Sequence, residues 1–199
     1  INKNERVFCA IRPPGHHAET TRAMGFCFVN NIAVTAKYLQ NKYKVNKISI
    51  IDFDVHHGNG TQDIFYNDET VSYASSHEFP LFPGTGSEQE TGIGNIFNAP
   101  LKTGLKSKDF LKIFDQKILK PVDKYKPEII LISAGFDAHL RDPLASINLE
   151  SKDFYLITKK IVELANVHSE GRIISFLEGG YDLLALSESI KEHLLALKV

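Results

Sequence analysis

Short apolar runs alternate with longer amphipathic stretches along this sequence of 199 residues. The short runs are rich in β-branched residues, a composition typical of strands buried on both faces of a parallel sheet. They predict strands at residues 7–11, 48–53, 129–133 and 173–177. The longer stretches predict helices at residues 30–43, 108–124, 151–168 and 183–197, the third with Ser151 as its N-cap. This alternation indicates a doubly wound α/β domain, in which a mainly parallel sheet carries helices on both faces.

The composition is that of an ordinary globular domain, with 43% hydrophobic and 24% charged residues. A net charge of -1 provides no basic surface, so we expect no direct binding of nucleic acid. No apolar run is long enough to span a bilayer and no signal-peptide pattern is present, so we expect no membrane association. Cys9 and Cys27 lack CxxC spacing and favour a reducing compartment, cytoplasmic or, in a eukaryote, nuclear. Composition leaves the oligomeric state open.

Residues that can carry chemistry follow each of the four predicted strands. Doubly wound sheets bind their ligands at the carboxyl ends of the strands. The segments found there are R-P-P-G-H-H from Arg12, D-F-D-V-H-H-G-N-G from Asp52, A-G-F-D-A-H from Ala134 and E-G-G-Y-D from Glu178. Their coincidence at equivalent positions predicts a site at one edge of the sheet.

The spacing of Asp52, Asp54 and His56 indicates a metal site. Alternate residues of an extended chain point to the same side, so two carboxylates and an imidazole share one volume. Close carboxylates repel unless a proton or a cation lies between them, and oxygen with nitrogen donors suits zinc. Asp137, at a different strand end, can complete the ligand set and leave a position for water and substrate. The alternative is that Asp52 and Asp54 only cap a turn or helix; Asp137 favours the metal.

Two histidines and a tyrosine are the other candidates. His16 and His17 follow a rigid Pro-Pro-Gly turn and could transfer protons near neutral pH, the alternative being two surface histidines. Tyr181 follows Gly179 and Gly180, which allow its loop to approach a ligand closely. The alternative role for Tyr181 is structural, with its ring packed against the following helix.

With these segments, the chain resembles the histone deacetylase and acetylpolyamine amidohydrolase superfamily, closest to its class II-like and bacterial members. The motifs follow the order of that family from Arg12 almost to the C-terminus: R-P-P-G-H-H-A, G-F-C-F-V-N-N, D-F-D-V-H-H-G-N-G-T-Q, F-P-G-T-G, S-A-G-F-D-A-H and L-E-G-G-Y. The resemblance implies the arginase/deacetylase-like fold. It also implies a single catalytic domain over residues 1–199, truncated at the N-terminus because family domains extend well before R-P-P-G-H-H.

The resemblance further implies a role for each site residue. The zinc ligands would be Asp54, His56 and Asp137, and iron(II) could replace zinc. His16 and His17 would flank the catalytic water, with Asp52 as the partner of His16 and Asn59 as the partner of His17. Tyr181 would hydrogen-bond the scissile carbonyl. The acyl-lysine tunnel would be formed by Gly25, Phe26, Phe82, Gly179 and Gly180, with Leu144 at its rim. A structural K⁺ ion would bind Asp52, Asp54, the His56 carbonyl, Ser75 and Ser76.

The expected activity is hydrolysis of the amide of acetyl-lysine, in a protein or peptide, with release of acetate. The main alternative is a deacetylase of acetylpolyamines or other small acylated amines, which Leu144 disfavours because leucine at the rim does not attract a cation. A non-catalytic acyl-binding module predicts loss of a metal ligand or of Tyr181, and neither is lost. An arginase-like dimetal hydrolase needs further metal carboxylates, for which Asp52 is the spare candidate.

Overall fold

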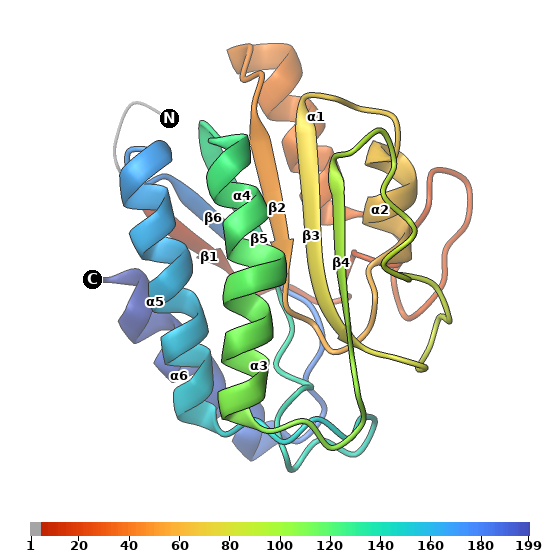
Figure 1. Cartoon of the computed structure of the whole chain (residues 1–199), viewed down its shortest axis with the longest axis vertical. Helices are drawn as coiled ribbons and strands as arrows, with labels where there is room; N and C mark the ends of the chain where they lie inside the picture. The colour runs from red at the N-terminus through yellow and green to blue at the C-terminus, as the bar shows by residue number, and fades with distance from the viewer. Residues whose placement is uncertain (1–4) are drawn as a thin grey trace.

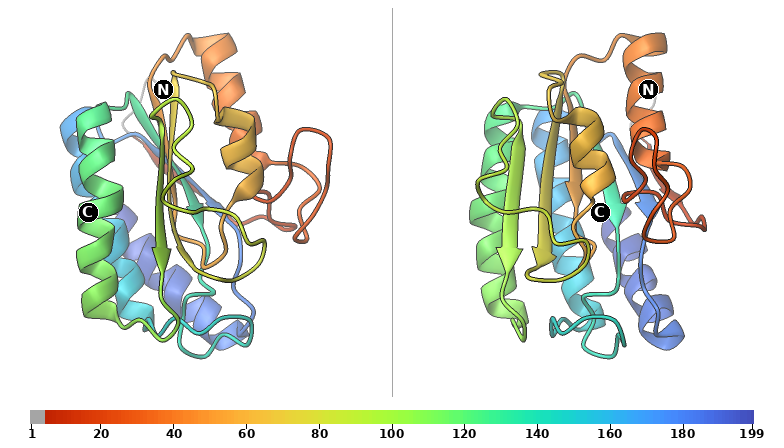
Figure 2. Two further views of the ribbon diagram at one scale, coloured as in Figure 1. Left: turned by 45° about the vertical axis from the view of Figure 1, so that its right-hand side comes forward. Right: turned by 90° about the vertical axis from the view of Figure 1, so that its right-hand side faces the viewer.

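The computed structural model describes residues 5–199, so the first four positions of the expected 1–199 domain lie outside the described part. In this part of the chain, six parallel strands form one sheet between two layers of helices (Figures 1 and 2). They are β1 (Arg6–Cys9), β2 (Ile48–Asp52), β3 (Val71–Glu78), β4 (Ile96–Leu101), β5 (Ile129–Ala134) and β6 (Ile173–Leu177). Across the sheet their order is β1-β6-β5-β2-β3-β4. The predicted fold class is confirmed.

Strands β3 and β4 were not predicted from the pattern. All eight residues of β3 are buried, but serines and a histidine interrupt its apolar residues, so no continuous apolar run marks it. Strand β4 carries Pro100 and forms the edge of the sheet among the described residues. Proline fits an edge strand because it has no N–H group to donate to a neighbouring strand, and one side of an edge strand has no neighbour.

The helices are α1 (Asn31–Tyr43), α2 (Asn59–Phe65), α3 (Ser107–Ile113), the π-helix η1 (Phe114–Leu119), α4 (Lys120–Tyr125), α5 (Ser151–His168) and α6 (Leu183–Leu197). The predicted helix at 108–124 is therefore a succession of three helical segments, and the short helix α2 was not expected. The N-cap of α5 is Glu150, and the prediction of Ser151 was wrong. Glu150 and Asp153 form a capping box that satisfies the first backbone N–H groups, which leaves Ser151 in the first turn.

Each face of the sheet has its own hydrophobic core. On one face, Ile129 and Leu131 of β5 pack with residues of α1 and α2. On the other face, Ile130 and Ile132 pack with residues of α3, η1 and α5. Alternate residues of one strand thus serve opposite cores, which is the arrangement expected for a sheet covered on both sides. Figure 2 shows the two helical layers from the side.

The order of the strands reverses beside β2. Strands β3 and β4 extend the sheet in one direction, and the chain then returns to place β5 on the other side of β2. Asp52 at the end of β2 is in register with Ser75 of β3 and Ser133 of β5. A crevice forms at the carboxyl ends of strands where such a reversal occurs. The segments after β2, β5 and β6 meet there.

Within the described residues, no helix has the length and apolar character needed to cross a membrane.

Candidate active site

The carboxylates of Asp54 and Asp137 converge with the imidazole of His56 at this crevice. His56 Nδ1 lies 3.2 Å from Asp54 Oδ1 and 3.0 Å from Asp137 Oδ2. Both carboxylates are buried, and the imidazole is partly exposed. Ligand atoms around a tetrahedral zinc ion, each bound at about 2.0–2.2 Å, lie about 3.3–3.6 Å from one another. The three side chains therefore form a cluster whose donor atoms and separations fit a metal ion.

Backbone groups fix the orientation of the two carboxylates. Gly179 N donates to Asp54 Oδ2 over 2.8 Å, and Val55 N donates to Asp137 Oδ1 over 2.9 Å. A side chain on Gly179 would overlap both carboxylates, so glycine is required where the segment after β6 passes the cluster. The backbone thus holds one oxygen of Asp137 and both oxygens of Asp54, whose Oδ1 also accepts from His56 N at 2.9 Å. Asp137 Oδ2 and Asp54 Oδ1 face the His56 ring.

The charges in the cluster depend on one another. Burial alone would lower the pKa of His56, but its hydrogen bonds to Asp137 and Asp54 outweigh burial and raise the pKa to about 11. Burial and the charge of Asp54 raise the pKa of Asp137 to about 7. The two carboxylates therefore require a positive charge between them, which a proton on His56 or a metal ion can supply.

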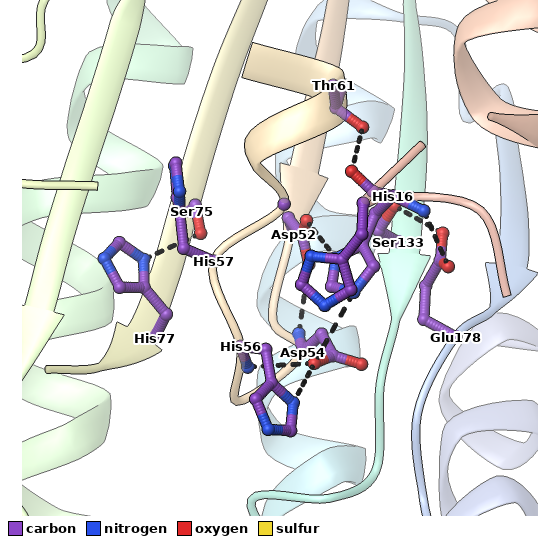
Figure 3. A network of polar contacts seen from close by, with 12 residues as sticks. His16, Asp52, Asp54, His56, His57, Thr61, Ser75, His77, Ser133 and Glu178 are labelled. Atoms are coloured by element: carbon purple, nitrogen blue, oxygen red, sulfur yellow. Dashed lines mark hydrogen bonds and ion pairs between the residues drawn. The ribbon is translucent and has the colours of Figure 1, made fainter. Parts of the chain in front are cut away.

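His16 and His17 lie side by side, with ring centres 4.0 Å apart, and have different partners. His16 Nδ1 is 3.0 Å from Asp52 Oδ2, and His17 Nδ1 is 2.9 Å from Asn59 Oδ1. Figure 3 shows the His16 ring among the acidic residues that follow β2. Burial would lower the pKa of His16, but nearby carboxylates, Asp52 foremost, raise it to about 10. At His17, burial and the neighbouring His16 cation lower the pKa to about 3.

A pocket of about 430 Å³ opens next to the metal cluster. Its lining residues are His17, Gly25, Phe26, His56, Leu81, Phe82, Leu144 and Tyr181. Six of these residues were predicted as site residues from the sequence and His56 as a metal ligand, whereas Leu81 was not predicted. Gly179 and Gly180, which were expected at the tunnel, are not among the lining residues. Gly179 contacts Asp54, and the Gly180 carbonyl accepts a hydrogen bond from Arg12.

Phe26, one of the aromatic residues of this pocket, is held by unusual backbone geometry. Gly25 and Phe26 both have positive φ, 56° and 65°, inside a tight turn closed by hydrogen bonds between Met24 and Cys27. A phenylalanine in the left-handed region costs roughly 1–2 kcal/mol, and such strain is concentrated where a structure holds a ligand. The turn places Phe26 with its ring centre 6.0 Å from that of Tyr181. The ring of Phe82 meets His17 edge-on at 5.1 Å.

Comparison with known proteins identifies the family of this site. A family model described as the histone deacetylase domain matches residues 1–197. The chain belongs to the histone deacetylase family. The crystal structure of the HDA15 HD domain superimposes with a TM-score of 0.89 at 36% identity, covering 96% of this chain and 56% of that one. The expected deacetylase-like fold is thereby confirmed.

Curated relatives agree with this assignment. The protein named histone deacetylase 10, chloroplastic, from Oryza sativa subsp. japonica is 44% identical over 189 residues, which cover 93% of this chain and 43% of that protein. A probable deacetylase of Archaeoglobus fulgidus is 42% identical over 188 residues, covering 92% of this chain and 52% of that protein. The chain spans about half the length of these relatives. The location expected for it, cytoplasmic or nuclear, stays a prediction, since the rice relative is named chloroplastic.

Sequence reasoning also missed Asp142, which links two parts of the pocket. Asp142 accepts hydrogen bonds from Tyr181 N at 2.8 Å and from Leu144 N at 3.0 Å, each with a different carboxylate oxygen. It therefore fixes both the tyrosine loop and the rim. Asp142 stands before Pro143, a pattern typical of turns, but nothing in the sequence indicates that this turn meets Tyr181.

Proposed function

We propose that this chain forms a single deacetylase catalytic domain that hydrolyses the amide of acetyl-lysine with the help of zinc. One observation carries the proposal: the cluster of Asp54, His56 and Asp137 adjoins a pocket that His17 and Tyr181 also line. The pocket thus combines a metal-binding group, a proton acceptor and a hydrogen-bond donor, which are the parts needed to hydrolyse an amide.

The donor set supports zinc as the metal. Two carboxylate oxygens and one imidazole nitrogen suit zinc, and they also suit iron(II). Three protein ligands leave a position for water and substrate, as catalytic zinc sites require. A zinc ion bound by Asp54, His56 and Asp137 would acidify water and polarise the amide carbonyl.

The hydrogen bonds of His17 support its role as general base. Asn59 Nδ2 donates to Glu19 Oε1 over 2.8 Å, so Asn59 presents its oxygen to His17 Nδ1. His17 Nδ1 is then the donor, and His17 Nε2 is left free to accept a proton from water. His16, paired with Asp52, remains cationic and stabilises negative charge that develops beside it. Protonation of the leaving amine by one of the two histidines completes the hydrolysis, with Tyr181 donating to the oxyanion.

The shape of the pocket supports an acyl-lysine substrate. Phe26, Leu81 and Phe82 present apolar surface that suits the methylene stem of lysine. Leu144 at the mouth offers no carboxylate to a cationic polyamine, so acetylated small amines are the second candidate. Zinc-loaded protein should hydrolyse an acetyl-lysine peptide faster than an acetylpolyamine or a peptide bearing a longer acyl chain, measured in each case as release of the free amine. Faster release from the polyamine would favour the second candidate, and zinc-loaded protein inert on all three would contradict deacetylation.

A K⁺ ion next to β3 is part of the same proposal. The ligands would be Asp52, Asp54, the His56 carbonyl, Ser75 and Ser76. The hydroxyl of Ser76 is buried without a hydrogen-bond partner among the described residues, which supports the presence of a cation there.

Replacing Asn59 with aspartate should move the acidic limb of the kcat/KM pH profile to higher pH. A carboxylate beside His17 Nδ1 stabilises the imidazolium, so the pKa of His17 rises from about 3. Below its pKa, His17 carries a proton and cannot accept another from water. Activity is therefore lost at a higher pH than in the unchanged protein.

The Asn59→Asp experiment needs a control for Glu19. Asn59 Nδ2 now donates to Glu19, so a carboxylate at position 59 would lie against a second one. Combining Asn59→Asp with Glu19→Gln removes that repulsion, and Glu19→Gln alone is the matched control. An acidic limb that stays in place in the double variant would mean that His17 is not the base.

A further inference from the structure

Glu178, at the end of β6, is a buried carboxyl that none of the steps above uses. Its side chain is 1% exposed. Oε2 accepts hydrogen bonds from the backbone N–H groups of Gly15, at 2.6 Å, and His16, at 3.1 Å. Oε1 accepts from the Ser133 hydroxyl at 2.9 Å. Figure 3 shows Glu178 reaching from β6 to His16 and Ser133. One side chain therefore joins β6, β5 and the loop that carries the paired histidines.

That loop depends on side chains for its hydrogen bonds. Gly15 and His16 lie outside helices and strands and are buried, so their N–H groups need a partner that secondary structure does not provide. The His16 carbonyl accepts from Thr61 N at 3.1 Å, and the His16 ring contacts Asp52 at 3.0 Å. Thr61 and Asp52 hold His16 from α2 and β2, while Glu178 holds it from β6. His16 is thus fixed at its amide, its carbonyl and its ring by three different elements.

All three donors to Glu178 are uncharged. Two backbone N–H groups and one hydroxyl need an acceptor with the reach of a glutamate side chain, and a neutral amide can satisfy them equally. The amide oxygen of a glutamine would accept from Gly15 and His16, and its NH₂ group would donate to Ser133 Oγ, because a hydroxyl both donates and accepts. Asp52 is different, because it faces the ring of His16 rather than its backbone.

We propose that Glu178 is a positioning residue that sets the place of the His16–His17 pair through the reach and hydrogen bonds of its side chain and not through its charge. The inference rests on the proposed function, in which these two histidines handle protons. A displacement of about 1 Å in a group that acts on the substrate can lower turnover roughly 10²-fold. The role of Glu178 should therefore appear in kcat more than in KM, since the walls of the pocket do not involve it.

Two conservative variants separate reach from charge. Glu178→Asp keeps the charge but is one methylene shorter, so it cannot contact Gly15, His16 and Ser133 together. Glu178→Gln keeps the reach and loses the charge. We expect Glu178→Asp to lower kcat roughly 10²-fold with KM and metal content nearly unchanged. Glu178→Gln should keep most of the turnover, and so should Ser133→Ala, which leaves both backbone contacts in place.

Nuclear magnetic resonance of the imidazole groups provides a readout that does not depend on activity. Glu178→Asp should shift the ¹⁵N signals of His16 and His17, and Glu178→Gln should leave them close to their original positions. The reverse order, with Glu178→Gln more impaired and more shifted than Glu178→Asp, would overturn the proposal in favour of a charge effect. Unshifted signals and normal kcat in Glu178→Asp would also overturn it. If the ¹⁵N signals of the two variants change as expected but the unchanged protein deacetylates none of the substrates, the proposed function is contradicted and the positioning role of Glu178 is not.

Discussion

Asp137→Ala is expected to abolish deacetylation and to leave the purified protein with far less than one metal ion per molecule. In the proposed site Asp137 would supply one of three donor atoms, and its Oδ2 lies 3.0 Å from His56 Nδ1. Loss of a group that merely orients a ligand lowers metal affinity about 10–100-fold, and loss of the ligand itself should lower it further. Protons on the remaining ligands, Asp54 and His56, then compete more effectively with the metal.

Metal content, measured by elemental analysis of protein purified with zinc and then dialysed, tests this expectation directly. Asp123→Ala is the matched control, because Asp123 is exposed on α4 and pairs with His168, away from the cluster. The control should keep both zinc and activity. Full zinc occupancy in Asp137→Ala would remove Asp137 from the ligand set, whatever the activity of that variant.

The sequence was most informative where local pattern and chemistry coincide. The strand ends predict that Asp52, Asp54, His56 and Asp137 meet at one edge of the sheet. The family resemblance then selects Asp54, His56 and Asp137 as the metal ligands. The structure brings these three side chains together. Strand β3 was not predicted, because its buried serines and His77 break the apolar pattern by which a buried strand is recognised in a sequence.

Residues whose role depends on a contact distant in sequence could not be predicted. Glu178 meets Gly15 across 163 positions of the chain, and Asp142 meets Tyr181 across 39. Neither contact follows from spacing or propensity. Both carboxylates accept hydrogen bonds from backbone N–H groups, which every residue except proline has, so the partner leaves no mark in the sequence. Leu81 likewise looks like any apolar residue until the fold places it at the pocket.

Tyr181→Phe should lower turnover roughly 10²–10³-fold while substrate and metal binding largely persist. The substitution removes only the hydroxyl. The ring keeps its contact with Phe26, and Asp142 still holds the backbone of residue 181, so the pocket keeps its shape. Burial and the nearby charges of Asp54 and Asp137 raise the pKa of Tyr181. The phenol therefore stays protonated over the working pH range and can donate a hydrogen bond to the oxyanion.

Single-turnover rates, KM and metal content together separate this effect from the loss caused by Asp137→Ala. Tyr181→Phe should lower kcat at full zinc occupancy, whereas Asp137→Ala should lose the metal itself. Tyr38→Phe, at an exposed position on α1, is the matched control and should behave as the unchanged protein does. Turnover close to normal in Tyr181→Phe would mean that the carbonyl oxygen has another partner. The stabilisation of the oxyanion would then have to come from the metal ion and the cationic His16, because Tyr181 is the pocket's one hydroxyl-bearing side chain among the described residues.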